Sequence, residues 1–250
     1  MGGDGLHMKP VSLFIPCIVD LLLPEIGEAT VSLLRRLGCR LTYHEEQTCC
    51  GLFSFNAGFR SEARRMARHF LEVFGEDEIV VSPSGSCVHM VRNRYPELFS
   101  DEPEWLDRAR SLSGRVYELS QFLVDVLGVG DVGAHYNGRV AYHESCNLLN
   151  GLGISEQPKK LIRAVHGAEW VSLKDADVCC GFGGEFSSNY PEISEALVSA
   201  KVKNYLESGA DLLVLCEPGC LLNIRGYLSR RHPDKTVLHL AEFLANRLTP

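Results

Sequence analysis

Two pairs of adjacent cysteines, each followed by glycine, are the residues of this chain with the clearest capacity for chemistry. Cys49-Cys50 lies in the stretch TCCGLFSF, and Cys179-Cys180 lies in DVCCGFGGEF. Thiolates bind zinc and the iron of iron–sulfur clusters, so the pairs indicate metal or redox chemistry. The chain of 250 residues has ten cysteines, and the other six are Cys17, Cys39, Cys87, Cys146, Cys216 and Cys220.

Composition and charge narrow the class of protein. Apolar residues make up 45% of the chain and charged residues 23%, with a formal net charge of −7, which is ordinary for a globular protein and gives no basic surface for nucleic acid. The apolar run 11–23 is too short and too interrupted to span a bilayer. The start, MGGDGLHMKP, lacks the features of a signal peptide. We therefore expect a cytoplasmic location, where disulfides are disfavoured.

The chain repeats itself. The unit Cys-Cys-Gly recurs 130 positions later in the chain. Three other stretches recur at similar spacing: VSLFIPC as VAYHESC after 129 positions, EIVVSPSGSC as DLLVLCEPGC after 133, and RVYELSQFL as TVLHLAEFL after 121. Four landmarks in the same order indicate an internal duplication. We expect a first repeat over residues 8–128, a linker over 129–138 and a second repeat over 139–250.

Each repeat alternates short apolar runs with helical patterns. This alternation predicts an α/β fold: two duplicated Rossmann-like halves with parallel sheets, related by a pseudo-two-fold axis. Helices are expected over PEIGEATVSLLRRLG and RSEARRMARHFLEVFG, and over PKKLIRAVHG and PEISEALVSAKVKNYLESG. The expected strands are 11–15, 40–43, 79–81 and 116–119 in the first half, and 140–143, 169–173, 212–215 and 237–240 in the second.

Most cysteines follow directly after an expected strand. The carboxyl ends of parallel strands share one edge of the sheet, where such folds place ligands. We therefore expect one metal site in each half. The expected ligands are Cys17, Cys49, Cys50 and Cys87 in the first half, and Cys146, Cys179, Cys180 and Cys220 in the second, with Cys216 as a further candidate. Cys39 has no counterpart and is expected to be structural.

Glycines and one histidine complete the candidate cofactor-binding residues. Gly51 and Gly181 allow the sharp turn that brings neighbouring thiols together. Gly183 and Gly184 allow bare backbone to approach a cluster. His143 precedes Cys146 and is expected to hydrogen-bond a ligand or relay a proton, or else to be a structural histidine.

Zinc is the alternative to iron. Structural zinc sites use tight C-x-x-C hooks, whereas these cysteines are spread over whole strand–helix units. No catalytic triad or phosphate-binding loop is present, so no catalytic residue is assigned.

The two CCG units resemble the cysteine-rich, or CCG-domain, family of iron–sulfur oxidoreductases. Its motif is a cysteine, some 31–38 residues, Cys-Cys-Gly, and then a C-x-x-C hook. Here 31 residues separate Cys17 from Cys49, and 32 separate Cys146 from Cys179. The hook is altered in both halves, since Ser84 and Glu217 stand at its first cysteine, and Cys216 lies one position earlier.

Within that family, CCGLFSFNAG, SPSGSC and CCGFGGEFS look like a two-repeat subfamily associated with lactate utilisation. The resemblance implies one or two iron–sulfur clusters, expected to be [4Fe–4S], and companion subunits in a redox complex. It implies electron transfer in oxidation of L-lactate or a similar 2-hydroxy acid such as glycolate. The CCG-containing subunit of heterodisulfide reductase and the iron–sulfur subunit of glycolate oxidase are also similar. The alternatives are thiol–disulfide reduction, as in heterodisulfide reductase, or a zinc-bound or metal-free scaffold.

Overall fold

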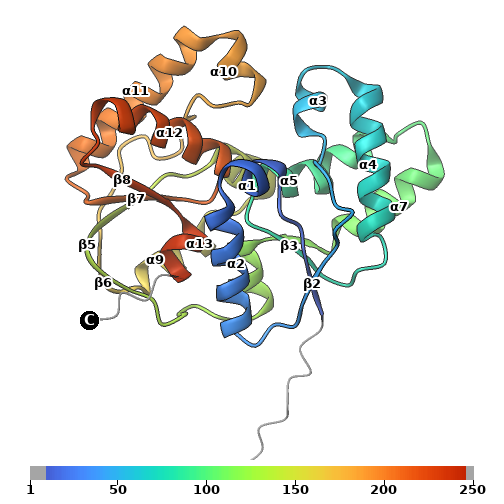
Figure 1. Ribbon diagram of the computed structural model, residues 1–250, viewed down its shortest axis with the longest axis horizontal. Coiled ribbons are helices and arrows are strands. Elements are labelled where there is room, and N and C mark those ends of the chain that lie inside the picture. Colours follow the sequence, from blue (N-terminus) through green and yellow to red (C-terminus); the bar gives the residue numbers. More distant parts are fainter. Residues whose placement is uncertain (1–9, 246–250) are drawn as a thin grey trace, which may run out of the picture.

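Two four-stranded parallel sheets form the framework of the molecule (Figure 1). The computed structural model describes residues 10–245. Strand order is β2-β1-β3-β4 in the first sheet and β6-β5-β7-β8 in the second, so the predicted α/β duplication is confirmed. The strands are β1 (Val11–Leu13), β2 (Leu41–Tyr43), β3 (Val80–Ser82) and β4 (Val116–Glu118), then β5 (His135–Tyr142), β6 (His166–Trp170), β7 (Leu212–Leu215) and β8 (Thr236–His239).

Helices connect the strands in both halves. The first half contains α1 (Cys17–Leu22), α2 (Pro24–Arg36), α3 (Leu52–Asn56), α4 (Arg60–Phe74), α5 (Gly85–His89), η1 (Met90–Arg94), α6 (Tyr95–Leu98), α7 (Pro103–Ser113), α8 (Leu119–Gln121) and η2 (Phe122–Val126). The second contains η3 (Asn147–Leu152), α9 (Glu156–Arg163), α10 (Glu185–Asn189), α11 (Pro191–Ser208), α12 (Pro218–Arg231) and α13 (Leu240–Ala245).

The four expected helices are present, with small changes in boundaries. Helices α2 and α11 both begin with a proline, which suits the first turn because it needs no backbone N–H there. Strand β5 starts at His135, inside the expected linker, and β6 starts three residues before its expected range. Helices α7 and α12 are the longest of the helices beyond those four. The predictions for the N-terminal segment and for the outer ends of the repeats, 1–9 and 246–250, lie outside the described residues.

Helices α4 and α11 are equivalent and bury the same face. Helix α4 buries positions 63, 67, 70, 71 and 74, and α11 buries positions 131 residues further on. This spacing of three and four residues is that of one stripe along a helix packed on a sheet. The two stripes differ in chemistry, because Phe70 in α4 corresponds to Lys201 in α11.

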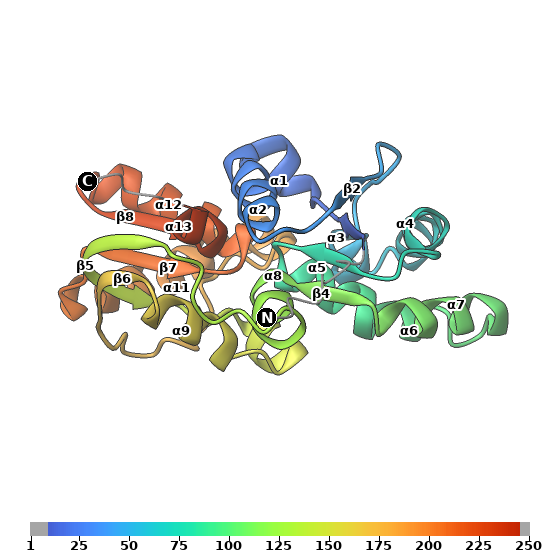
Figure 2. The same cartoon turned by 90° about the horizontal axis from the view of Figure 1, so that it is seen from below.

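The two halves exchange contacts symmetrically. Helix α13 of the second half packs on α2 of the first, and α8 of the first half packs on α9 of the second. Likewise α5 packs on η3, and α1 contacts α12. Figure 2 shows the two halves side by side, joined through these central helices. The reciprocal pattern is that of a pseudo-two-fold axis, which brings the carboxyl ends of both central strands toward the junction.

No helix among the described residues is long and apolar enough to cross a membrane.

Candidate metal centre

The first half gathers its four cysteines at one sheet edge, as expected. Cys17 is the first residue of α1, the helix that follows β1. Cys49 and Cys50 precede α3, and Cys87 lies in the first turn of α5, after β3. The Sγ atoms of Cys17 and Cys49 are 3.6 Å apart.

The second half repeats this arrangement. Cys146 immediately precedes η3, Cys179 and Cys180 precede a glycine-rich turn, and Cys220 lies in the first turn of α12. The Sγ atoms of Cys180 and Cys220 are 2.8 Å apart. Within each set the burial is uneven, because Cys50 and Cys180 are buried whereas Cys179 is exposed. No disulfide joins any of these thiols.

Both sets open onto one cavity. The cavity lies between the halves and has a volume of about 110 Å³. Its wall comes from both repeats, and Figure 1 shows α1 lying between α3 of the first half and α12 of the second. The sequence predicts two sites, and the structure shows that they share one chamber. The eight thiols in its lining are those of Cys17, Cys49, Cys50, Cys87, Cys146, Cys179, Cys180 and Cys220.

The glycine after each cysteine pair has a backbone that other residues rarely adopt. Gly51 has φ +85° and Gly181 has φ +84°, both in the left-handed region. Each turn brings its N–H back to the first thiol of the pair, Gly51 to Cys49 Sγ at 3.4 Å and Gly181 to Cys179 Sγ at 3.3 Å. The turn therefore positions the pair and stabilises one thiolate.

Hydrogen bonds between neighbouring thiols lower the pKa of one thiol and raise the pKa of its partner. Hydrogen bonds from Cys17 and Cys50, joined by the N–H of Gly51, lower the pKa of Cys49. The same contact with Cys49 raises the pKa of Cys17. In the second half, hydrogen bonds from Cys146 and Cys180 lower the pKa of Cys179. The first cysteine of each pair is thus the thiol most readily deprotonated, as metal binding requires.

Gly183 and Gly184 also line the cavity. Their φ angles are +51° and +62°, so this turn also needs glycine. A side chain at Gly184 would collide with the ring of Phe53 from the first half. The loop therefore closes one wall of the chamber against the other half.

The altered hook positions meet across the junction. Glu217 is only 7% exposed, and its carboxylate accepts hydrogen bonds from Ser86 N (2.8 Å), Ser86 Oγ (2.8 Å) and Ser84 Oγ (3.4 Å). Burial raises the pKa of Glu217, while these hydrogen bonds act in the opposite direction. Where the family motif has a cysteine, this chain has a buried contact that joins the halves.

His143 lies beneath the second cysteine set rather than in the cavity wall. It is 1% exposed, and its Nδ1 lies 3.0 Å from the carbonyl oxygen of Ala176. Its Nε2 is buried without a hydrogen-bond partner. Burial, with the nearby charge of Lys201, lowers the pKa of His143 to about 4. The ring is therefore neutral near pH 7.

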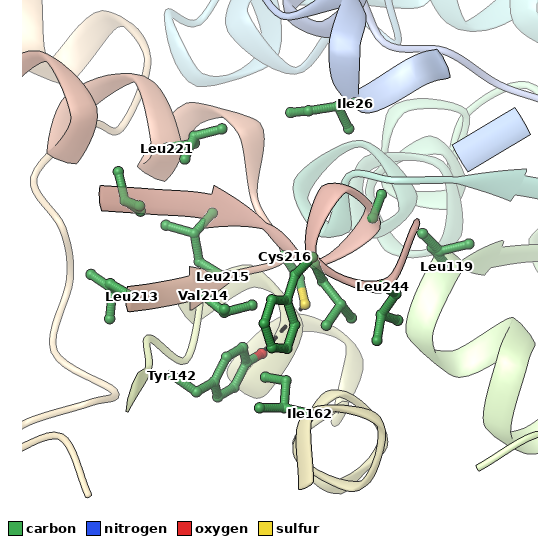
Figure 3. Close-up of a cluster of buried hydrophobic side chains, with 14 of the residues drawn as sticks. Ile26, Leu119, Tyr142, Ile162, Leu213, Val214, Leu215, Cys216, Leu221 and Leu244 are labelled. Carbon is green, nitrogen blue, oxygen red and sulfur yellow. Dashed lines mark hydrogen bonds between the residues drawn. The ribbon is translucent and has the colours of Figure 1, made fainter. Parts of the chain in front are cut away.

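The structure does not bring Cys216 to the cavity. Its side chain is fully buried in the core, where the hydroxyl of Tyr142 points at Cys216 Sγ at 3.6 Å (Figure 3). The figure shows this thiol on the same side of the strand as Val214, near Tyr142 and Ile162, whereas Leu215 points to the opposite side. Cys39 is also buried in the core and is absent from the cavity lining.

Two contributors to the site were missed from the sequence. Lys201 is buried beneath the second cysteine set, and Ser86 holds Glu217. Both residues have counterparts at equivalent positions of the other repeat. A residue-by-residue alignment of the two halves would therefore have shown where these positions differ. Lys201 occupies the buried stripe of α11, where a charged residue departs from the pattern of its twin helix.

Comparisons with known proteins agree with the two matched halves of the structure. A family described as "Cysteine-rich domain" (CCG) matches twice, over residues 11–92 and 140–225. The chain is 45% identical to lactate utilization protein A of an Exiguobacterium strain, across 95% of this chain and 97% of that protein. It is 44% identical to the protein of the same name from Bacillus subtilis, across 95% of this chain and 99% of that protein.

A solved structure shares the fold. A hypothetical protein from Helicobacter pylori superposes with a TM-score of 0.63 at 12% identity, covering 94% of this chain and 48% of that chain. At this identity the likeness concerns the fold alone.

Proposed function

The chain belongs to the cysteine-rich CCG-domain family, and from this premise we propose that it is an iron–sulfur electron-transfer subunit of a complex that oxidises L-lactate or a similar 2-hydroxy acid, such as glycolate. The observation that carries the proposal is the pair of matched four-thiol sets facing one cavity. The printed name of the relatives, lactate utilization protein A, supports the substrate class.

The chemistry of the donors fits an iron–sulfur group. Thiolates are the usual protein ligands of such clusters, and each half supplies four of them at one sheet edge. When bound, the cluster would supply one-electron transfer. We assign the eight cavity cysteines as its ligands in one or both halves. Gly51 and Gly181 position the thiols, and Gly183 and Gly184 leave room for a bound group.

The cavity is a poor binding site for the acid itself. Carboxylates are recognised in proteins by arginine, lysine or clustered N–H donors. No lysine or arginine is among the described residues that line the cavity, and Glu217 contributes a carboxyl group there rather than a cation. We therefore infer that companion subunits bind the 2-hydroxy acid and that this chain accepts and passes on the electrons.

The first experiment measures metal content. The chain is purified without oxygen, and iron, acid-labile sulfide and zinc are determined. We expect iron and sulfide together. Cys50→Ser and Cys180→Ser should each lower the iron content, whereas Cys39→Ser, which removes a buried thiol of the core, should not. Colourless protein that holds zinc and no iron would overturn the proposal and favour the scaffold role.

The second experiment addresses the substrate. Lactate-dependent reduction of a dye is assayed with the companion subunits, with and without this chain. We expect dye reduction to fall in its absence, and to fall equally when Cys50→Ser or Cys180→Ser replaces it. Full activity without the chain would contradict a role in electron transfer.

The shared chamber favours a second candidate, thiol–disulfide reduction. A small disulfide in the chamber would face both cysteine sets at once. Two electrons from a reduced viologen dye and two protons would convert it into two thiols. Disulfide-dependent oxidation of the dye by the isolated chain would support this candidate over the first.

A further inference from the structure

The residues beneath the two cysteine sets differ between the halves. In the first half, Phe14 and Phe70 pack edge to face with ring centroids 4.8 Å apart. The duplication places His143 at the position of Phe14 and Lys201 at that of Phe70. An apolar contact in one half has therefore become a pair of nitrogen-bearing side chains in the other.

One carbonyl fixes the tautomer of His143. The oxygen of Ala176 lies 3.0 Å from His143 Nδ1 and 3.2 Å from Lys201 Nζ, and it also accepts the N–H of Glu144 at 3.0 Å. A carbonyl oxygen only accepts hydrogen bonds, so Nδ1 carries the proton. In the neutral ring the lone pair is then on Nε2.

The imidazole lies among thiols. A ring nitrogen of His143 and the Sγ atoms of Cys180 and Cys220 all lie within 4.8 Å of one another, and all three residues are buried. Because Nδ1 is bound to Ala176, the nitrogen free to act is Nε2, which has no hydrogen-bond partner. A buried acceptor without a partner costs about 1–3 kcal/mol, so its retention needs a reason. Metal-bound histidines characteristically donate their other N–H to a carbonyl, as His143 does to Ala176.

We propose that His143 Nε2 is a metal ligand in the second half, alongside Cys180 and Cys220. The proposal rests on the proposed function for the kind of metal group, whereas the ligand is inferred from the imidazole beside the two thiols and from the hydrogen bond that occupies Nδ1. It compensates for the altered hook, since Glu217, at the usual cysteine position, is turned toward Ser86 of the other half. The first half has no such ligand, because Phe14 stands there.

Lys201 supports this ligand from outside the metal site. Its ammonium donates to the carbonyls of Asp175 and Ala176 and so fixes the oxygen that orients the imidazole. Lys201 is a positioning residue and touches no bound group.

The test looks for nitrogen bound to the metal. The chain is labelled with ¹⁵N in its histidine rings, reconstituted anaerobically with ferrous iron and sulfide, reduced, and studied by pulsed EPR. We expect the strong coupling of a directly bound ¹⁵N in the wild type and its loss in His143→Gln. His239→Gln is the matched control, because it removes another buried imidazole whose Nε2 lacks a partner but which, among the described residues, is not grouped with cysteine thiols as His143 is. It should keep the coupling.

A second measurement uses release of iron to a chelator. His143→Gln and His143→Phe should each speed release from the second half about tenfold, the lower end of what lost metal-site contacts cost. Circular dichroism reports whether the variants are folded.

The outcomes separate the two proposals. Bound iron and sulfide without a histidine coupling in the wild type, or with a coupling that survives in His143→Gln, overturns the ligand and leaves the function intact. Bound zinc without iron overturns the function. Zinc-edge X-ray absorption then tests the ligand, which stands if His143→Gln has one nitrogen fewer and falls if it does not.

Discussion

The two halves of this chain have equivalent cysteines, but different residues pack beneath them. The carbonyl of Cys50 accepts the hydroxyl of Tyr95 at 2.9 Å, within an aromatic cluster. The carbonyl of Cys180 accepts the amide of Asn223 at the same distance. The duplication has kept the cysteines and the turn while replacing the residues beneath them. The shared features define what is bound, and the differing features distinguish how each half holds it.

The largest expected difference between the halves concerns the glycine of each CCG turn. A Cβ at Gly181 would lie 2.7 Å from Ser194 O and 2.9 Å from Leu197 Cβ, whereas at Gly51 the nearest atom would be Met66 Cβ at 3.3 Å. Both substitutions carry the strain of a positive φ. Gly181→Ala should therefore lower the free energy of unfolding by about 3–4 kcal/mol, and Gly51→Ala by about 1–2 kcal/mol. Urea denaturation measures both, and equal losses would contradict the difference in crowding.

The next effect concerns the contacts that join the halves. The buried carboxylate of Glu217 accepts three hydrogen bonds, so Glu217→Ala should cost about 2–3 kcal/mol. Arg225 also bridges the halves, to Glu25 at 2.8 Å, but both side chains are about one-third exposed or more. Arg225→Ala should cost less than about 1 kcal/mol. Should denaturation give the reverse order, Glu217 is not the main polar contact between the halves.

A smaller effect is expected in the pH dependence of stability. Glu118 and His239 are equivalent positions at the ends of β4 and β8. Burial raises the pKa of Glu118 to about 7 and lowers that of His239 to about 4. As pH rises from about 4.5 to 7, the folded state holds the Glu118 proton that the unfolded state releases, so this residue lowers stability. His239 acts in the opposite sense, raising stability as pH rises from about 4 to 6.5.

Two variants separate these contributions. Relative to the wild type, the free energy of unfolding of Glu118→Gln should rise by about 1–2 kcal/mol between about pH 4.5 and 7. That of His239→Gln should fall by a similar amount between about pH 4 and 6.5. The measurement is urea denaturation of the metal-free chain at steps between pH 4 and 7. Parallel curves for the wild type and both variants would show that neither group titrates as described.

The smallest effect concerns Lys201. A nearby positive charge stabilises the more negative, reduced form of a cluster. Lys201→Met should therefore lower the midpoint potential of the group in the second half. We expect a shift of about 59 mV, which corresponds to a tenfold change in a one-electron equilibrium. Phe70→Leu, at the equivalent position, should leave the first-half group unchanged. An equal shift at both groups in Lys201→Met would indicate a general disturbance rather than a local charge.

Much of the fold followed from patterns in the sequence. The landmarks of the repeat predicted both sheets, and the strands that precede Cys17 and Cys146 placed those thiols at the sheet edges. The shared chamber did not follow, because the repeats define each half but not the face by which the halves pack. Cys216 was a candidate on spacing alone, yet β7 carries it into the core. The role of Glu217 depends on Ser86, 131 residues away, and no local pattern connects them.

A potentiometric titration of the anaerobically reconstituted chain, followed by EPR, tests the contrast between the halves most directly. With both halves filled, we expect two midpoint potentials. Cys180→Ser should abolish the more positive one, which belongs to the half with Lys201, and Cys50→Ser should abolish the more negative one. A single potential with both halves filled, or the more positive potential assigned to the first half, would contradict this expectation.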